Sequence, residues 1–116
     1  QKESLLDRRL VVVGFSQGGY LAPFIGLNHK QTRKVVGLNC QFLDEEFLES
    51  PQFEMVGING SDDDVVDFPK VADSVNRLKQ NGVKVKLVEV KRAGHRITDE
   101  FVTILKKELN DSGSKP

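Results

Sequence analysis

A run of three valines that leads into a serine flanked by glycines, VVVGFSQGG (Val11 to Gly19), constrains the fold of this chain more than any other feature. A short continuous run of β-branched residues is typical of a strand covered on both faces. Glycine permits backbone conformations that other residues avoid, so the segment predicts a strand over 10–13 that ends in a sharp turn. A helix should follow from Gly18 to about Asn28, and its dense apolar residues predict that it is mostly buried.

The rest of the chain alternates strand and helix patterns. Two further strands are predicted from Val35 to Asn39 and from Phe53 to Asn59. An apolar stripe at helical spacing then predicts a helix that stops at Asn81-Gly82, followed by a strand from Val83 to Val90 whose lysines place it near a sheet edge. A last helix begins near Thr98. This alternation predicts right-handed crossovers and an α/β fold, with a mostly parallel sheet and helices on both faces.

Composition narrows the class of protein. With 116 residues, 38% of them hydrophobic, and no long apolar run, the chain is predicted to be soluble, at most one domain, and without a membrane span. Seventeen basic and seventeen acidic side chains cancel, so charge does not favour nucleic acid as a partner. The single cysteine, Cys40, cannot form an internal disulfide, and no signal peptide is visible, so a cytoplasmic location is expected.

Ser16 falls just past the first predicted strand, at the edge of the sheet where ligands of parallel sheets bind. A tight strand-to-helix turn strains the residue at its tip, and Gly14 and Gly18 are predicted to remove β-carbons that would collide there. The turn exposes the Ser16 hydroxyl, and the backbone N–H of Gln17 points toward any oxyanion that forms. This is the Gly-x-Ser-x-Gly pattern of a nucleophile elbow. The alternative is a glycine-rich turn that only closes tightly or cradles a phosphate.

A serine nucleophile needs a base that a carboxylate orients, and on this fold the order along the chain is serine, acid, histidine. Of the two histidines, His29 follows the far end of the first helix, on the opposite edge of the sheet from Ser16. His95 lies in the loop after the last strand, on the same edge as Ser16, and is the predicted base. Four aspartates of one loop compete for the role of the carboxylate: Asp62, Asp63, Asp64 and Asp67.

Together, GFSQGG, Gly60-x-x-Asp63-x-x-Val66 and Gly94-His95 resemble the α/β-hydrolase superfamily, and within it the carboxylesterase and acyl-protein thioesterase (phospholipase/carboxylesterase) family. The resemblance implies that Ser16 is the nucleophile and His95 the general base and acid, and it selects Asp63 as the orienting carboxylate. It also implies an α/β-hydrolase domain, of which residues 1–110 form the C-terminal part and residues 111–116 a disordered tail.

The activity that the resemblance implies is cleavage of small-molecule carboxylic esters or thioesters through an acyl-enzyme, with no metal or organic cofactor. Two alternatives stay open: a serine peptidase or amidase on the same fold, and a catalytically silent hydrolase-like domain used for binding or assembly. Asn39-Cys40 departs from the family, which often has a Ser-Gly pair there. Cys40 has no adjacent base motif and is expected to be a buried small residue.

In the family the sheet has several strands before the nucleophile strand, and a loop among them supplies a second oxyanion donor. This chain holds only the part from the nucleophile strand onward, so 11–13 would form an unpaired apolar edge. We therefore expect these residues to be the C-terminal part of a longer hydrolase, or to pair with another chain that completes the sheet.

Overall fold

The computed structural model describes residues 10–42 and 51–111. Its strands are β1 (Leu10–Phe15), β2 (Thr32–Leu38), β3 (Glu54–Gly60) and β4 (Val85–Val90), and its helices are α2 (Gln17–Leu27), α3 (Phe68–Gln80) and α4 (Asp99–Asp111). The four strands form one parallel sheet in the order β1-β2-β3-β4. The predicted α/β class is therefore confirmed, with β4 at an edge of this sheet. None of the helices described is long and apolar enough to cross a membrane.

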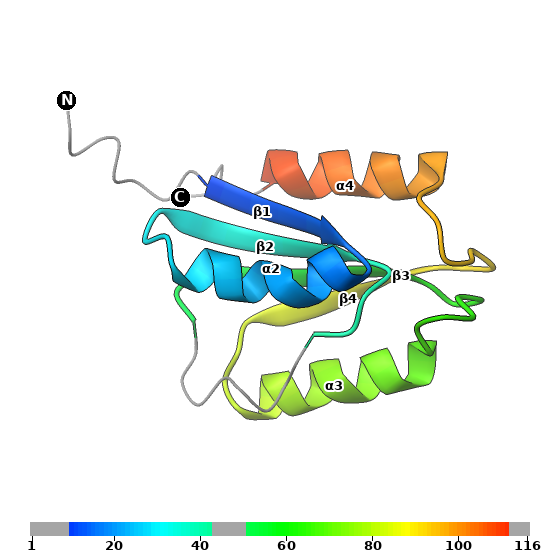
Figure 1. Cartoon of the computed structure of the whole chain (residues 1–116), viewed down its shortest axis with the longest axis horizontal. Coiled ribbons are helices and arrows are strands. Elements are labelled where there is room, and N and C mark those ends of the chain that lie inside the picture. Colours follow the sequence, from blue (N-terminus) through cyan, green and yellow to red (C-terminus); the bar gives the residue numbers. More distant parts are fainter. Residues whose placement is uncertain (1–9, 43–50, 112–116) are drawn as a thin grey trace.

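The helices cover both faces of the sheet (Figure 1), with α2 and α3 on one face and α4 on the other. Successive strand residues point to opposite faces. Val35 of β2 belongs to the hydrophobic cluster that includes Ala22 of α2 and Val71 of α3, whereas Val36 belongs to the cluster that includes Phe101 of α4. Each strand in the middle of the sheet is thus buried on both sides, as the continuous apolar runs predict.

Element boundaries differ from the predicted ones by a few residues. β1 continues to Phe15, two residues beyond the valine run, and β4 begins at Val85 rather than at Val83. β2 begins at Thr32 rather than at Val35, because the polar residues before Val35 pair with β1 and are mostly buried there. α4 includes Asp111, and residues 112–116 of the predicted tail lie outside the described part of the chain.

β1 and α2 are less buried than the sequence predicts. Only small residues of α2 are buried, namely Gly19, Ala22, Pro23 and Gly26, whereas Leu21 is 52% exposed and Ile25 and Leu27 are nearly half exposed. The prediction of a mostly buried helix is therefore wrong for this structure. The small residues let α2 approach the sheet closely, since a β-carbon at Gly26 would lie 3.0 Å from Val35. Among the described residues, the outward-facing apolar side chains of α2 have no second layer to pack against.

A buried charged cluster joins α4 to the amino end of the sheet. The side chains of Lys34 on β2 and Glu108 on α4 are only 4% and 6% exposed, and Lys34 Nζ donates to Glu108 Oε1 at 3.1 Å and to its backbone carbonyl at 3.0 Å. Lys86 Nζ lies 2.8 Å from Glu108 Oε2, and Glu54 lies 3.6 Å from Lys34. Burial raises the pKa of Glu108, but hydrogen bonds from Lys86 and Lys34 outweigh burial and hold this pKa below its ordinary value.

The substitution Glu108→Gln should lower the free energy of unfolding by about 3 kcal/mol, because it leaves the buried Lys34 without its closest counter-charge. Urea unfolding at pH 7 measures this loss. The matched control is Glu89→Gln, at an exposed position of β4, which should change stability by less than about 0.5 kcal/mol. Equal losses in the two variants would contradict the assignment.

The pH dependence of this loss follows from the lowered pKa of Glu108. A carboxyl group whose pKa is lower in the folded state stabilises the protein above its unfolded pKa, and this contribution disappears as the pH falls through the folded value. The stability difference between the native protein and Glu108→Gln should therefore narrow in acid.

Candidate active site

Ser16 lies at the carboxyl end of β1, between the last residue of that strand and the first residue of α2. Figure 1 shows that β1 leads into α2 through a tight turn. The backbone of Ser16 has φ 55° and ψ −117°, a conformation that residues with a side chain rarely adopt. The Ser16 N–H donates to the carbonyl of Leu38 on β2 at 2.9 Å, and the Ser16 carbonyl accepts from the N–H of Tyr20 at 3.1 Å. The strained turn is thus fixed both to the neighbouring strand and to the first turn of the helix.

The predicted role of glycine in this turn is confirmed for Gly14 and wrong for Gly18. A β-carbon at Gly14 would lie 2.2 Å from the carbonyl oxygen of Gly18, so strand and helix can cross here only without a side chain at Gly14. A β-carbon at Gly18 would meet nothing within 4 Å, so the collision predicted there does not exist. Gly19 has the second close approach, because its β-carbon would lie 2.6 Å from Cys40 Sγ.

Replacement of Gly14 by alanine should destabilise the fold by at least about 3 kcal/mol, since the obstacle is backbone and no side chain can move away. Gly18→Ala should have the opposite sign and stabilise the protein by about 0.5 kcal/mol, because alanine favours a helix over glycine and the space is open. Thermal unfolding followed by circular dichroism compares the two variants. A similar loss of stability in both would show that the close approach at Gly14 is not the cause.

Three side chains from three separate loops meet beside this turn. The Oγ of Ser16 lies 3.0 Å from Nε2 of His95, and Nδ1 of His95 lies 2.7 Å from Oδ2 of Asp63. An ionised carboxylate can only accept a hydrogen bond, so Nδ1–H donates to Asp63 and Nε2 is left to accept the Ser16 hydroxyl proton. The structure therefore brings together the three residues that the motifs single out.

Asp63 is fixed by burial and by three hydrogen bonds. Its side chain is fully buried, and its Oδ1 accepts the backbone N–H groups of Val65 and Val66, both at 2.8 Å. Burial raises the pKa of Asp63, but hydrogen bonds from His95 and from these two N–H groups outweigh burial and hold this pKa below its ordinary value. The other three candidate aspartates, Asp62, Asp64 and Asp67, are all exposed.

His95 is placed by the loop that follows β4. Its side chain is 17% exposed, and its ring packs against the ring of Phe15 with centroids 5.1 Å apart. Sequence reasoning did not single out Phe15, although its position next to Ser16 at the end of β1 is the signal that could have done so. His29 is exposed at the far end of α2, where the chain turns back to the amino end of β2, and it is not part of this site.

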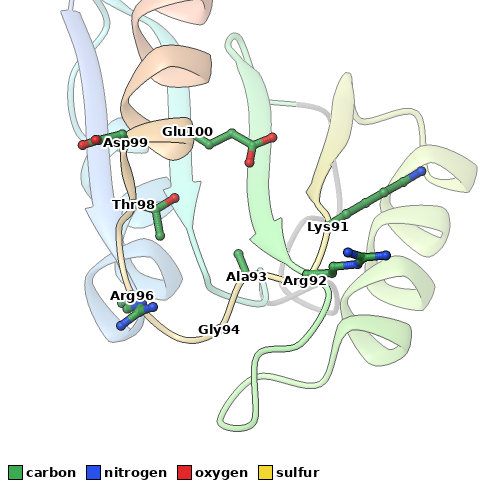
Figure 2. A pocket seen from close by; sticks show the side chains of 8 residues that line it. All are labelled: Lys91, Arg92, Ala93, Gly94, Arg96, Thr98, Asp99 and Glu100. Carbon is green, nitrogen blue, oxygen red and sulfur yellow. The ribbon is translucent and has the colours of Figure 1, made fainter.

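The loop between β4 and α4, residues 91–98, carries His95 and is called the His95 loop. It borders a hollow of about 420 Å³ (Figure 2). Its wall carries Lys91 and Arg92 on one side and Arg96 on the other, with Asp99 and Glu100 at the start of α4. Acidic and basic groups are mixed here, and most of them are exposed. The loop therefore has a solvated charged side, in addition to the side on which His95 meets Ser16.

A second hollow, of about 530 Å³, opens directly beside Ser16. Gln17 and Tyr20 of α2 line it together with Val65 and Val66 from the Asp63 loop. Gln17 is the first residue of α2, so its backbone N–H belongs to the positive end of the helix dipole. The hollow thus has an apolar wall next to Ser16, and negative charge near the backbone N–H of Gln17 would be favoured there.

Cys40 also lines this hollow, and burial raises the pKa of its thiol to about 12. The thiol stays protonated at neutral pH and is a weak nucleophile, in agreement with the prediction of a buried small residue. Within residues 10–42 and 51–111, no group of three histidine, cysteine or acidic side chains is arranged to hold a metal ion.

Comparison with known proteins gives independent evidence of the family and the fold of this chain. The model of a phospholipase/carboxylesterase family matches residues 1–112. Among solved structures, esterase PE8 superimposes with a TM-score of 0.73 at 23% identity, over 87% of this chain and 49% of the esterase. SOBER1 of Arabidopsis thaliana gives a TM-score of 0.74 at 19% identity, over 94% and 57%. Esterase 2 of Thermogutta terrifontis, phosphonylated by cyclosarin, gives 0.65 at 17% identity, over 87% and 52%.

The chain thus spans about half the length of each of these solved structures. A comparison with curated proteins gives no match.

Proposed function

Because this chain belongs to the phospholipase/carboxylesterase family of the α/β-hydrolase superfamily, we propose that it carries the nucleophile, acid and base of a serine hydrolase. Its substrates are carboxylic esters or thioesters. The observation that carries the proposal is the pair of hydrogen bonds that links Ser16 to His95 and His95 to Asp63. A strained serine at the tip of a strand-to-helix turn supports the same reading.

In the acylation step, Nε2 of His95 removes the proton of the Ser16 hydroxyl while Oγ attacks the carbonyl carbon of the substrate. Asp63 accepts Nδ1–H throughout and stabilises the imidazolium that forms. The negative charge on the carbonyl oxygen is held by the backbone N–H of Gln17 at the start of α2. His95 then returns the proton to the leaving alcohol or thiol, and the acyl group remains as an ester on Ser16.

Deacylation repeats these steps with water as the nucleophile. His95 takes a proton from water, the hydroxide attacks the acyl-serine carbonyl, and the carboxylic acid leaves as Ser16 recovers its proton. Every proton moves between Ser16, His95, the substrate and water, so the cycle closes without a metal or an organic cofactor.

The remaining part of the hydrolase domain has two roles in this proposal. It supplies the second donor to the oxyanion, which in this fold comes from a loop outside the region spanned here. It also continues the sheet beyond β1 and covers the exposed side chains of Val13, Leu21 and Ile25. The half-length coverage of the solved relatives supports this part of the proposal.

A fluorophosphonate probe tests the proposed function on the protein as its natural source makes it. Such probes bond covalently to activated serines, and one solved relative carries a phosphonyl group derived from cyclosarin. We expect labelling of the peptide that contains Ser16, identified by mass spectrometry, and competition by an ester substrate. Absence of labelling in the folded protein would favour the catalytically silent alternative.

A substrate panel then separates an esterase or thioesterase from an amidase. We expect turnover of p-nitrophenyl esters or acyl-thioesters and not of matched peptide amides. Faster cleavage of the amides would replace this proposal with a serine peptidase.

A further inference from the structure

Asn39 lies at the carboxyl end of β2, on the same edge of the sheet as Ser16. It is fully buried, and its backbone has φ 50°, in the left-handed region that asparagine tolerates better than most residues. Its backbone N–H donates to the carbonyl of Ile58 on β3 at 2.8 Å. A buried polar side chain in this conformation must find partners for both its donor and its acceptor.

The partners of Asn39 come from the His95 loop and from the end of β3, directly before the Asp63 loop. Its Nδ2 donates to the carbonyl of Gly94 at 3.3 Å and to the carbonyl of Arg96 at 3.1 Å, the residues immediately before and after His95. Its Oδ1 accepts the backbone N–H of Gly60, the last residue of β3 before the Asp63 loop, at 2.9 Å. Figure 2 labels Gly94 and Arg96 in the bend of the His95 loop.

We propose that Asn39 is the positioning residue that holds the His95 loop so that one imidazole meets both Ser16 and Asp63. This inference rests on the proposed function. Two carbonyls that flank His95 are held by one amide group, so the loop is fixed on both sides of the ring rather than at a single point. The same side chain is bonded to the start of the Asp63 loop, so the two loops are held in register with each other.

We call the hydrogen bonds of Asn39 to the His95 loop and to Gly60 the Asn39 clamp. Its importance follows from the geometry of the site. His95 contributes two hydrogen bonds in opposite directions, at 3.0 Å to Ser16 and 2.7 Å to Asp63, and a shift of its backbone lengthens at least one of them. A displacement of about 1 Å in a catalytic group can reduce the rate on the order of 10²-fold. None of the hydrogen bonds of the Asn39 side chain reaches Ser16 or Asp63. Its effect on their distances to His95 is therefore transmitted through the backbone of the His95 loop.

Two substitutions test the clamp in the naturally produced protein. Asn39→Asp keeps the acceptor for Gly60 but replaces the donor with an oxygen that faces the carbonyls of Gly94 and Arg96. Asn39→Gly keeps the left-handed backbone accessible and removes the whole side chain. We expect each to lower kcat by about 10²-fold with KM changed by no more than about twofold, because the chemical step and not substrate binding depends on the position of His95.

The matched control is Asn59→Asp, the same change at another fully buried asparagine whose Nδ2 donates to the carbonyl of Cys40 and not to the His95 loop. It is expected to lower the melting temperature but to leave kcat within about twofold of the native value at a temperature where all variants are folded. A kcat loss in Asn59→Asp equal to that in the Asn39 variants would overturn the inference, since general destabilisation would then explain both.

A second readout does not depend on turnover. Long-range proton–nitrogen correlation NMR of the histidine rings reports which ring nitrogen carries the proton, and the exposed His29 serves as an internal reference. We expect one tautomer of His95 in the native protein, protonated on Nδ1, and a mixture in the Asn39 variants. A single unchanged tautomer in both Asn39 variants would overturn the inference. Failure of the native protein to react with a fluorophosphonate would reject the proposed function, while the ring spectra would still decide the role of Asn39.

Discussion

Ser16→Ala should abolish covalent labelling by a fluorophosphonate probe and reduce ester turnover by at least about 10⁴-fold. The loss should be this large because the hydroxyl forms the bond to the acyl group, and neither His95 nor Asp63 can replace it. Probe labelling followed by mass spectrometry, together with initial rates on a p-nitrophenyl ester, measures both effects. The strained turn leaves room for alanine, since the substitution removes a single oxygen atom.

Ser61→Ala is the control for the specificity of the label. Ser61 lies on the same edge of the sheet, but its Oγ accepts the backbone N–H of Arg92 and does not contact the imidazole. Labelling should therefore persist in Ser61→Ala. Labelling that survives in Ser16→Ala would show that another serine is the nucleophile, and the proposed mechanism would be wrong.

Asp63→Asn should lower kcat by about 10⁴-fold while the protein remains folded. Asparagine has nearly the same shape, but it removes the charge that stabilises the imidazolium and can donate to Nδ1, which favours the tautomer with the proton on Nε2. Steady-state kinetics measures the loss, and the control is Asp64→Asn in the same loop, where the side chain is exposed. An equal loss in Asp64→Asn would mean that the loop, and not the carboxylate of Asp63, is responsible.

The pKa of Asp63 adds a pH dependence to this comparison. Its folded pKa is lowered, so the carboxylate stabilises the folded protein above the unfolded pKa of about 3.9, and this contribution is lost as the pH falls through the folded value. The difference in melting temperature between the native protein and Asp63→Asn should therefore be largest near neutral pH and should shrink in acid. A constant difference across the whole range would contradict the lowered pKa.

Element types and their order could be predicted from the sequence because each depends on a local pattern. The valine run before Ser16, the apolar stripe of α3 and the lysines of β4 each determine one element without reference to the rest of the chain. The proximity of Ser16, His95 and the loop that carries the four aspartates follows from topology instead, and the family resemblance then selects Asp63. Parallel strands bring their carboxyl ends to one edge, so residues that follow these strands meet there even when they are far apart in sequence.

Contacts that depend on the packing of one particular loop against another could not be predicted. Asn39 is separated by 55 and 57 residues from the two carbonyls that it holds, and no spacing rule connects them. Phe15 has a local signal, its position next to Ser16, but its ring contact with His95 could not be predicted because it depends on the path of the His95 loop. The only local signal for the role of Asn39 is that it is a polar residue directly after a buried strand.

The role of Gly18 and the burial of α2 were predicted wrongly because both depend on which neighbours are present. A motif records that glycine occurs at a position but not which atom would collide with a side chain there, and the collision is at Gly14 and Gly19. Hydrophobicity likewise records that Leu21 and Ile25 favour burial, whereas their exposure depends on the surfaces available to cover them.

The Lys34–Glu108 cluster and the Ser16 turn lie at opposite ends of the sheet. Sites that share no partners contribute almost additively, so substitutions at one end leave the other nearly unaffected. Heat tolerance and chemistry in this fold can accordingly be tuned as separate traits. Substitutions around the charged cluster should therefore change the melting temperature without moving the side chains beside Ser16.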